Sequence, residues 1–195
     1  AAGFVQVFPT GSGAAGQSSN VNVDAAGQTL PSAAFTRIGE DGQVSVISSL
    51  TTHVIFDVFG YFVPASESSE GRLVPLDPTR ILDTRVGLGW SPAAPGTGPT
   101  PGNVSGGDVI TLQVEGRGGV PSSGVSAVVM NVTAVSPTSA GFVQVAPTPV
   151  DRGSSSNLNP DAGRTNANLV VVPVADGGTV DIYTELYVNG GRLDL

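Results

Sequence analysis

The sequence predicts an all-β protein, made of tandem β-sandwich modules of a jelly-roll-like or Ig-like kind, with no significant helix. Short runs of β-branched and aromatic residues, bounded by Gly, Pro, Asn or Asp, are typical of strands. Their regular spacing, with turn signals between them, is typical of a sandwich. The expected strands cover residues 5–8, 34–38, 44–47, 53–59, 109–114, 125–135, 142–145, 168–174 and 180–183.

Asp-Gly pairs strengthen this prediction. Asp41-Gly42 and Asp176-Gly177 each lie between two strand-like runs, which is a strong hairpin signal because this dipeptide suits the tight turn between paired strands.

An internal repeat organises the chain. Residues 3–7 (GFVQV) return unchanged as 141–145, residues 18–24 return as 155–161 with two changes, and 41–46 matches 176–181. Residues 1–62 are therefore expected to repeat within 141–195, whereas 75–135 occurs once. The predicted organisation is the second half of a first module (1–62), a linker (63–72), and a second, nearly complete module (73–195) with a Pro- and Gly-rich loop (91–107).

Composition and charge exclude several functions. The net charge of −8 disfavours nucleic acid as a partner, and all 8 cationic residues are Arg, so no lysine is present for Schiff-base or P-loop chemistry. The absence of Cys removes disulfides and thiolate metal sites. The longest strongly apolar stretch, 169–174, is too short for a membrane span. The first residues do not form a signal peptide, so we expect any export signal to have been removed or to lie outside this sequence.

Charged residues inside apolar segments predict a structural ion-pair network. Asp57, and Asp194 at the matching place in the repeat, interrupt strand-like runs, where a carboxylate needs a partner. Arg80 and Arg85 flank Asp83 and offer cationic partners. The alternative is recognition of a ligand by the planar guanidinium groups.

Rows of oxygen-bearing side chains allow a calcium site as an alternative to edge-strand hydrogen bonding. In each copy, three of these side chains fall on one face of an expected strand. The residues are Asn20, Asn22 and Asp24 in the first copy and Asn157, Asn159 and Asp161 in the second. Otherwise no cofactor is expected.

Few residues point to sugars or catalysis. Trp90 in a Gly- and Pro-rich loop, together with Tyr61, is the best indication of a glycan contact; anchoring of the loop is the alternative. His53 is the single histidine and has no counterpart in the second copy, so it is interpreted as a surface or loop-packing residue. No catalytic motif is complete, and the protein is predicted not to be an enzyme.

Four motifs carry a family resemblance. They are 78–85 (PTRILDTR), 116–121 (GRGGVP), 128–135 (VVMNVTAV) and 52–62 (THVIFDVFGYF). Together they resemble a module of secreted actinobacterial proteins, where it occurs in tandem and beside catalytic domains. The resemblance implies an exported or cell-surface protein and carries no established activity. If the resemblance holds, the chain is either a segment of a longer array of modules, or neighbouring copies of it complete one another by strand addition. The second arrangement would build a filament.

These observations lead to one main hypothesis and two alternatives. The main hypothesis is a non-enzymatic extracellular structural or adhesive repeat protein of a bacterial surface, which polymerises through its edge strands. The first alternative is a carbohydrate-binding module that tethers a cell or enzyme to polysaccharide. The second is a hydrolase fragment, which would need His53, Asp57, Arg80 and Asp83 in one open cleft.

Overall fold

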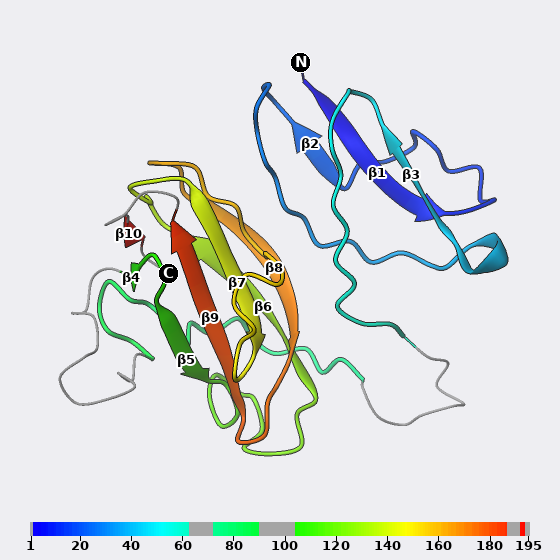
Figure 1. The fold of residues 1–195 in the computed structure, drawn as a ribbon. Helices are drawn as coiled ribbons and strands as arrows, with labels where there is room; N and C mark the ends of the chain where they lie inside the picture. Colours follow the sequence, from blue (N-terminus) through cyan, green and yellow to red (C-terminus); the bar gives the residue numbers. More distant parts are fainter. Residues whose placement is uncertain (1, 63–71, 90–103, 187–191, 194–195) are drawn as a thin grey trace. The chain divides into compact units, whose positions relative to one another are not determined.

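The protein is all-β, as predicted. A computed structural model describes residues 2–62, 72–89, 104–186 and 192–193 (Figure 1). Within these ranges the chain forms ten strands and one short 3-10 turn, η1 (Glu40–Gly42), and no helix there has the length and apolarity needed to cross a membrane. The chain divides into two compact units, Ala1–Phe56 (unit 1) and Asp57–Leu195 (unit 2).

Unit 1 contains a three-stranded antiparallel sheet with the order β2-β1-β3. Its strands are β1 (Gly3–Pro9), β2 (Val21–Val23) and β3 (Val44–Ser48).

Unit 2 contains two principal antiparallel sheets and a small third one. The first sheet has the order β5-β9-β7, the second pairs β6 with β8, and the third pairs β4 with β10. The strands are β4 (Val104–Ser105), β5 (Val109–Gln113), β6 (Ala127–Ala134), β7 (Gly141–Pro147), β8 (Asn166–Pro173), β9 (Thr179–Leu186) and β10 (Arg192–Leu193).

The core of unit 2 lies between the two principal sheets. Because side chains alternate along a strand, every second residue of each sheet faces the opposite sheet. Leu112, Val145 and Ile182 come from the first sheet, and Val128 and Val172 come from the second; each is less than a tenth exposed. Unit 2 is therefore a sandwich-like pair of layers around one apolar cluster.

The Asp-Gly turns form, but they do not close hairpins of hydrogen-bonded strands. In unit 2 the turn at 175–178 connects β8 to β9, which belong to different sheets, and only Ala175 and Thr179 bridge across it. The turn thus carries the chain from one layer to the other. Contact between the segments of β6 and β8 extends one residue beyond Pro173, because the Val174 N–H donates to the Ser126 carbonyl oxygen at 3.0 Å.

The two copies of the repeat share one strand register. Val7 pairs with Val46 in unit 1, as Val145 pairs with Ile182 in unit 2. At the strand ends, Pro9 pairs with Val44 and Pro147 with Val180. Val44 therefore corresponds to Val180, one residue beyond the sequence match of 41–46 with 176–181. Equivalent residues of the two strands are therefore assigned from the pairing in the structure, because a shift of one residue would turn every side chain to the other face of the sheet.

The corresponding apolar face in unit 1 is uncovered. Val180 and Ile182 are 0% and 2% exposed, whereas their counterparts Val44 and Val46 are 45% and 42% exposed. Unit 1 has no strands corresponding to β5 and β6 among its described residues. Among the described residues, the second layer is therefore present over the sheet of unit 2, and unit 1 contains no equivalent strands to cover its own sheet.

Two expected strands do not form. Residues 34–38 and 53–59 carry no strand assignment. In the second copy of the repeat, the segment equivalent to residues 34–38 belongs to β8. In unit 2, β8 pairs with β6 along its whole length. The described residues of unit 1 include no counterpart of β6, and Ile38 of this segment is 68% exposed.

Identical substitutions at equivalent positions test the uncovered face. We expect Val180→Ala to lower the free energy of unfolding by about 2–3 kcal/mol, since it removes buried methyl groups and leaves a cavity. Val44→Ala should cost less than about 1 kcal/mol, because its side chain is already partly solvated. Urea denaturation followed by circular dichroism measures both; equal losses would contradict an uncovered face in unit 1.

Candidate functional site

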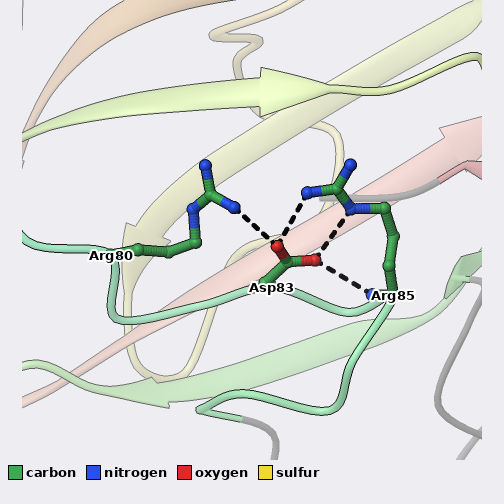
Figure 2. Close-up of polar contacts among 3 residues, drawn as sticks. All are labelled: Arg80, Asp83 and Arg85. Carbon is green, nitrogen blue, oxygen red and sulfur yellow. Dashed lines mark hydrogen bonds and ion pairs between the residues drawn. The ribbon is translucent and has the colours of Figure 1, made fainter.

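Asp83 is the centre of a compact charge cluster (Figure 2). Its carboxylate is 5% exposed and accepts hydrogen bonds from two guanidinium groups. Arg80 donates Nη1–H to Oδ2 at 2.8 Å. Arg85 donates Nε–H to Oδ1 at 2.9 Å and Nη2–H to Oδ2 at 2.7 Å, and its backbone N–H reaches Oδ1 at 3.2 Å. The Arg85 pair has the two-point geometry that makes a guanidinium–carboxylate contact strong.

A tight turn holds the cluster in place. Asp83 and Leu88 form an isolated antiparallel bridge, with both N–H···O distances at 3.0 Å. Gly89 then passes so close to the chain that a Cβ would lie 1.9 Å from the carbonyl oxygen of Ile81, and its φ of +72° also suits glycine. Ile81 and Leu82 pack against the core of unit 2. The cluster therefore fastens the turn to that core.

The electrostatics of the cluster favour a structural role. The hydrogen bonds from Arg85 lower the pKa of Asp83 well below its usual range; those from Arg80 and the charge of Arg85 add to this, and desolvation opposes it in part. Within the described residues the ion pairs are Arg80–Asp83 and Arg85–Asp83. Asp57 is exposed and belongs to neither pair. Asp194 lies outside the described residues. The structure thus brings together Arg80, Asp83 and Arg85 of the predicted network.

A buried glutamine organises a loop in each copy. Gln6 and Gln144 are both 1% exposed. The Nε2 group of Gln144 donates to the Asp151 carbonyl and to Ser154 Oγ, both at 2.9 Å, and its Oε1 accepts from the Gly153 N–H at 2.8 Å.

Gln6 repeats this pattern in unit 1. It donates to the Ala14 carbonyl at 2.8 Å and to Ser18 Oγ at 3.0 Å, and it accepts from the Gly16 N–H at 2.7 Å. Sequence reasoning missed both residues. The signal was a glutamine at the same place among the valines of both copies.

Two of the six proposed metal ligands instead bind the backbone. Asn20 Oδ1 accepts the Val7 N–H at 2.7 Å, and Asn157 Oδ1 accepts the Val145 N–H at 2.6 Å. These equivalent contacts match the edge hydrogen-bonding interpretation.

The other four proposed ligands are solvent-facing or only partly buried. Asn22, Asp24 and Asp161 are exposed, and Asn159 Oδ1 accepts from Ser156 Oγ at 3.3 Å. Within the described ranges, no three His, Asp or Glu side chains gather to hold a metal ion.

A buried carboxylate in β9 was also missed. Asp181 is 4% exposed and accepts hydrogen bonds from Thr111 Oγ1 at 2.7 Å, Thr148 Oγ1 at 3.0 Å and the Val150 N–H at 3.1 Å. Unit 1 has a smaller version of this contact, in which Thr10 and Ser45 hydroxyls lie 2.8 Å apart. Nothing in the spacing distinguished Asp181 from a solvent-facing residue of the strand.

Tyr183 is the centre of an aromatic contact on the outer face of the same sheet. Its ring lies edge-on to Phe142 at 5.9 Å, and the Arg152 guanidinium lies 5.6 Å from the ring centre. Its hydroxyl donates to Glu185 Oε2, and this bond, with burial and the nearby negative charge, raises the pKa of Tyr183. Together with Gln144 and Asp181, this contact fastens the loop 148–154 onto the sheet.

The residues proposed for glycan contact or catalysis do not form a described site. Trp90 lies outside the described residues, Tyr61 is 82% exposed, and His53 is exposed.

Two shallow hollows lie on unit 2. One of about 600 Å³ is lined by Glu115, Asp176 and the turn beside them, and the other, of about 300 Å³, lies between β7 and β8 with Phe59 at its wall. Neither holds a cluster of aromatic side chains among the described residues.

Comparison with models of protein families, with curated proteins and with solved structures finds no match to this chain.

The pKa of Asp83 predicts a pH dependence of stability. Because the pKa is lowered in the folded state, the carboxylate contributes stability above its unfolded value of about 3.9, and this contribution is lost as the pH falls through the folded value. Asp83→Asn should therefore be less stable than the wild type at pH 7, and the difference should shrink towards pH 2. Denaturation at several pH values measures this, with the exposed Asp161→Asn as the control. A difference that is unchanged at low pH would contradict the assignment.

The asparagine contact predicts a loss that does not depend on calcium. Asn157→Ala leaves the buried Val145 N–H without its acceptor and should cost about 1–3 kcal/mol, both with calcium and with a chelator. Asn159→Ala, whose side chain makes one long hydroxyl contact, should cost less than about 1 kcal/mol. Thermal unfolding measures both variants, and a loss confined to calcium-containing buffer would instead favour a metal site.

Proposed function

We propose that the chain is a non-enzymatic extracellular structural or adhesive repeat protein of a bacterial surface, and that its copies assemble into a filament by completing one another's β-sheets. The observation that carries the proposal is the uncovered face of unit 1. Its sheet keeps the register of unit 2, yet Val44 and Val46 remain about half exposed where Val180 and Ile182 are buried.

The physical reason is the instability of an open apolar sheet. A sheet with one uncovered apolar face and free edges tends to pair with another chain, because both the main-chain hydrogen bonds and the apolar area are then satisfied. Unit 1 offers such a surface. In unit 2, the layer formed by β6 and β8 covers the equivalent sheet.

Sequence features support the extracellular and non-enzymatic parts of the proposal. The chain contains no lysine or cysteine, and the four motifs resemble a tandem module of exported proteins. The polar side chains of the candidate site bind one another and the backbone, which is a structural use. The tandem sandwich arrangement belongs to this proposal as well.

The carbohydrate-binding alternative rests on Trp90 and Tyr61. A sugar site usually needs aromatic rings that converge on one face, and Tyr61 is the one of the two within the described residues. We place this alternative second.

Electron microscopy and light scattering on the wild-type chain over a range of concentrations, with and without chelator, test the proposal. We expect regular fibres. Val46→Asp places a charge on the uncovered face and should raise the concentration needed for assembly about tenfold or more. The matched control is Val129→Asp, at a similarly exposed position of β6 (44%), which should assemble like the wild type. A wild-type chain that stays monomeric at every concentration would overturn the proposal, and saturable glycan binding by that monomer would favour the alternative.

A further inference from the structure

Residues 54–58 form an exposed segment with a strong preference for β structure. The sequence there is Val-Ile-Phe-Asp-Val, and Ile55, Phe56 and Val58 are 87%, 54% and 88% exposed. The ladder between β1 and β3 ends at Ser48, and the structure assigns no strand to residues 51–62. An apolar run of this kind, outside any described sheet, is suited to pairing with another strand.

The second copy of the repeat shows where such a segment pairs. In unit 2 the chain after β9 returns as β10, which pairs antiparallel with β4; Arg192 lies opposite Ser105, and Leu193 lies opposite Val104. The sequence repeat aligns Asp57 with Asp194, which is one residue further along than the register that makes Val44 equivalent to Val180. With this one-residue insertion in the second copy, Ile55 corresponds to Arg192 and Phe56 to Leu193. Residues 55 and 56 are therefore the counterparts of the two residues that pair with β4.

The acceptor strand β4 is held in position independently of β10. Thr184 Oγ1 donates to the Ser105 carbonyl at 2.8 Å, and the Gly107 N–H donates to the Thr184 carbonyl at 2.7 Å. The Ser105 N–H donates to Asp108 Oδ2 at 2.9 Å. Val104 is fully buried in the core cluster, so a residue opposite it on the same face meets apolar surroundings. Phe56 suits that position, because it is large and apolar.

The described part of unit 1 offers no such acceptor. Its described strands are β1, β2 and β3, and none corresponds to β4. Residues 54–56 end unit 1 and residues 57–58 begin unit 2, and among the described strands the one that accepts the equivalent segment is β4 of unit 2.

We propose that residues 54–58 of one copy add to β4 of a second copy in the place of β10, with Ile55 opposite Ser105 and Phe56 opposite Val104. This inference rests on the proposed function and names its donor and acceptor. The contact joins two different surfaces and requires that β10 of the accepting copy leave β4. A copy that accepts a donor in this way still presents its own residues 54–58, so the contact can propagate from copy to copy.

Because the chain contains no cysteine, disulfide trapping can test this register directly. Ile55→Cys and Ser105→Cys are purified separately and mixed under mild oxidation at a concentration where the wild type assembles. Directly opposed residues of antiparallel strands have Cα atoms about 4.5–5.5 Å apart, which a disulfide can span. We expect a disulfide-linked dimer that contains one chain of each variant. Val86→Cys, at an exposed position (74%) in a turn, replaces Ile55→Cys in the control mixture and should give no dimer above background.

Hydrogen exchange on the wild-type chain provides a second measurement that needs no substitution at Ser105. The backbone amides of residues 54–58 should exchange more slowly in the assembled protein than in the dilute one. Assembly without the disulfide dimer and without this protection would overturn the inference and leave the proposed function standing. A chain that never assembles would overturn both.

Discussion

The structure depends on covering both faces of a β-sheet. The sheet of unit 2 has an apolar inner face, which β6 and β8 cover, and a polar outer face, which the loop 148–154 covers through Gln144 and Asp181. When both layers are present, the valines and isoleucine of the strands become fully buried, and apolar burial is the main favourable term in folding. Unit 1 keeps the outer cover but has no described inner layer, and this single difference explains its exposed valines and its missing strand at 34–38.

Hydrogen-bonded polar groups keep the strand register where the apolar layer is missing. In both units an asparagine accepts a hydrogen bond from the backbone N–H of the second valine of the first strand, which is Val7 in unit 1 and Val145 in unit 2. A glutamine of the same strand binds the loop that follows it. These contacts are local or lie on the outer face, so they form without a second sheet. They are also costly to leave unpaired in a buried site, which favours one register over its neighbours. The two copies therefore fold their first sheet alike, although their burial differs.

The sequence was informative about what a residue does locally and less informative about what lies beside it. β-branched runs, turn residues and the repeat predicted the all-β class, and the Arg-x-x-Asp-x-Arg spacing placed Arg80, Asp83 and Arg85 near one another. Residues 53–59 have the composition of a strand, but a strand also needs a hydrogen-bonded neighbour, and pairing between distant segments leaves no local pattern. The same reason hid Asp181, whose partners come from β5 and a loop. The Asp-Gly turns were located correctly, but the link that the turn at 175–178 makes between different sheets depends on tertiary packing.

The glutamine contact has a consequence for how the loops can vary. Gln144 recognises a carbonyl, a serine hydroxyl and a glycine N–H, and Gln6 recognises the same three groups in a loop of different sequence. Only Gly16 and Gly153, with φ of 76° and 77°, are constrained by backbone conformation at the shared N–H. The side chains of Thr148, Arg152 and Ser154 also contact the sheet, so we expect diversity at the loop positions whose side chains make no such contact. Such a loop resembles a display platform, on which foreign peptide sequences could be grafted and presented to antibodies.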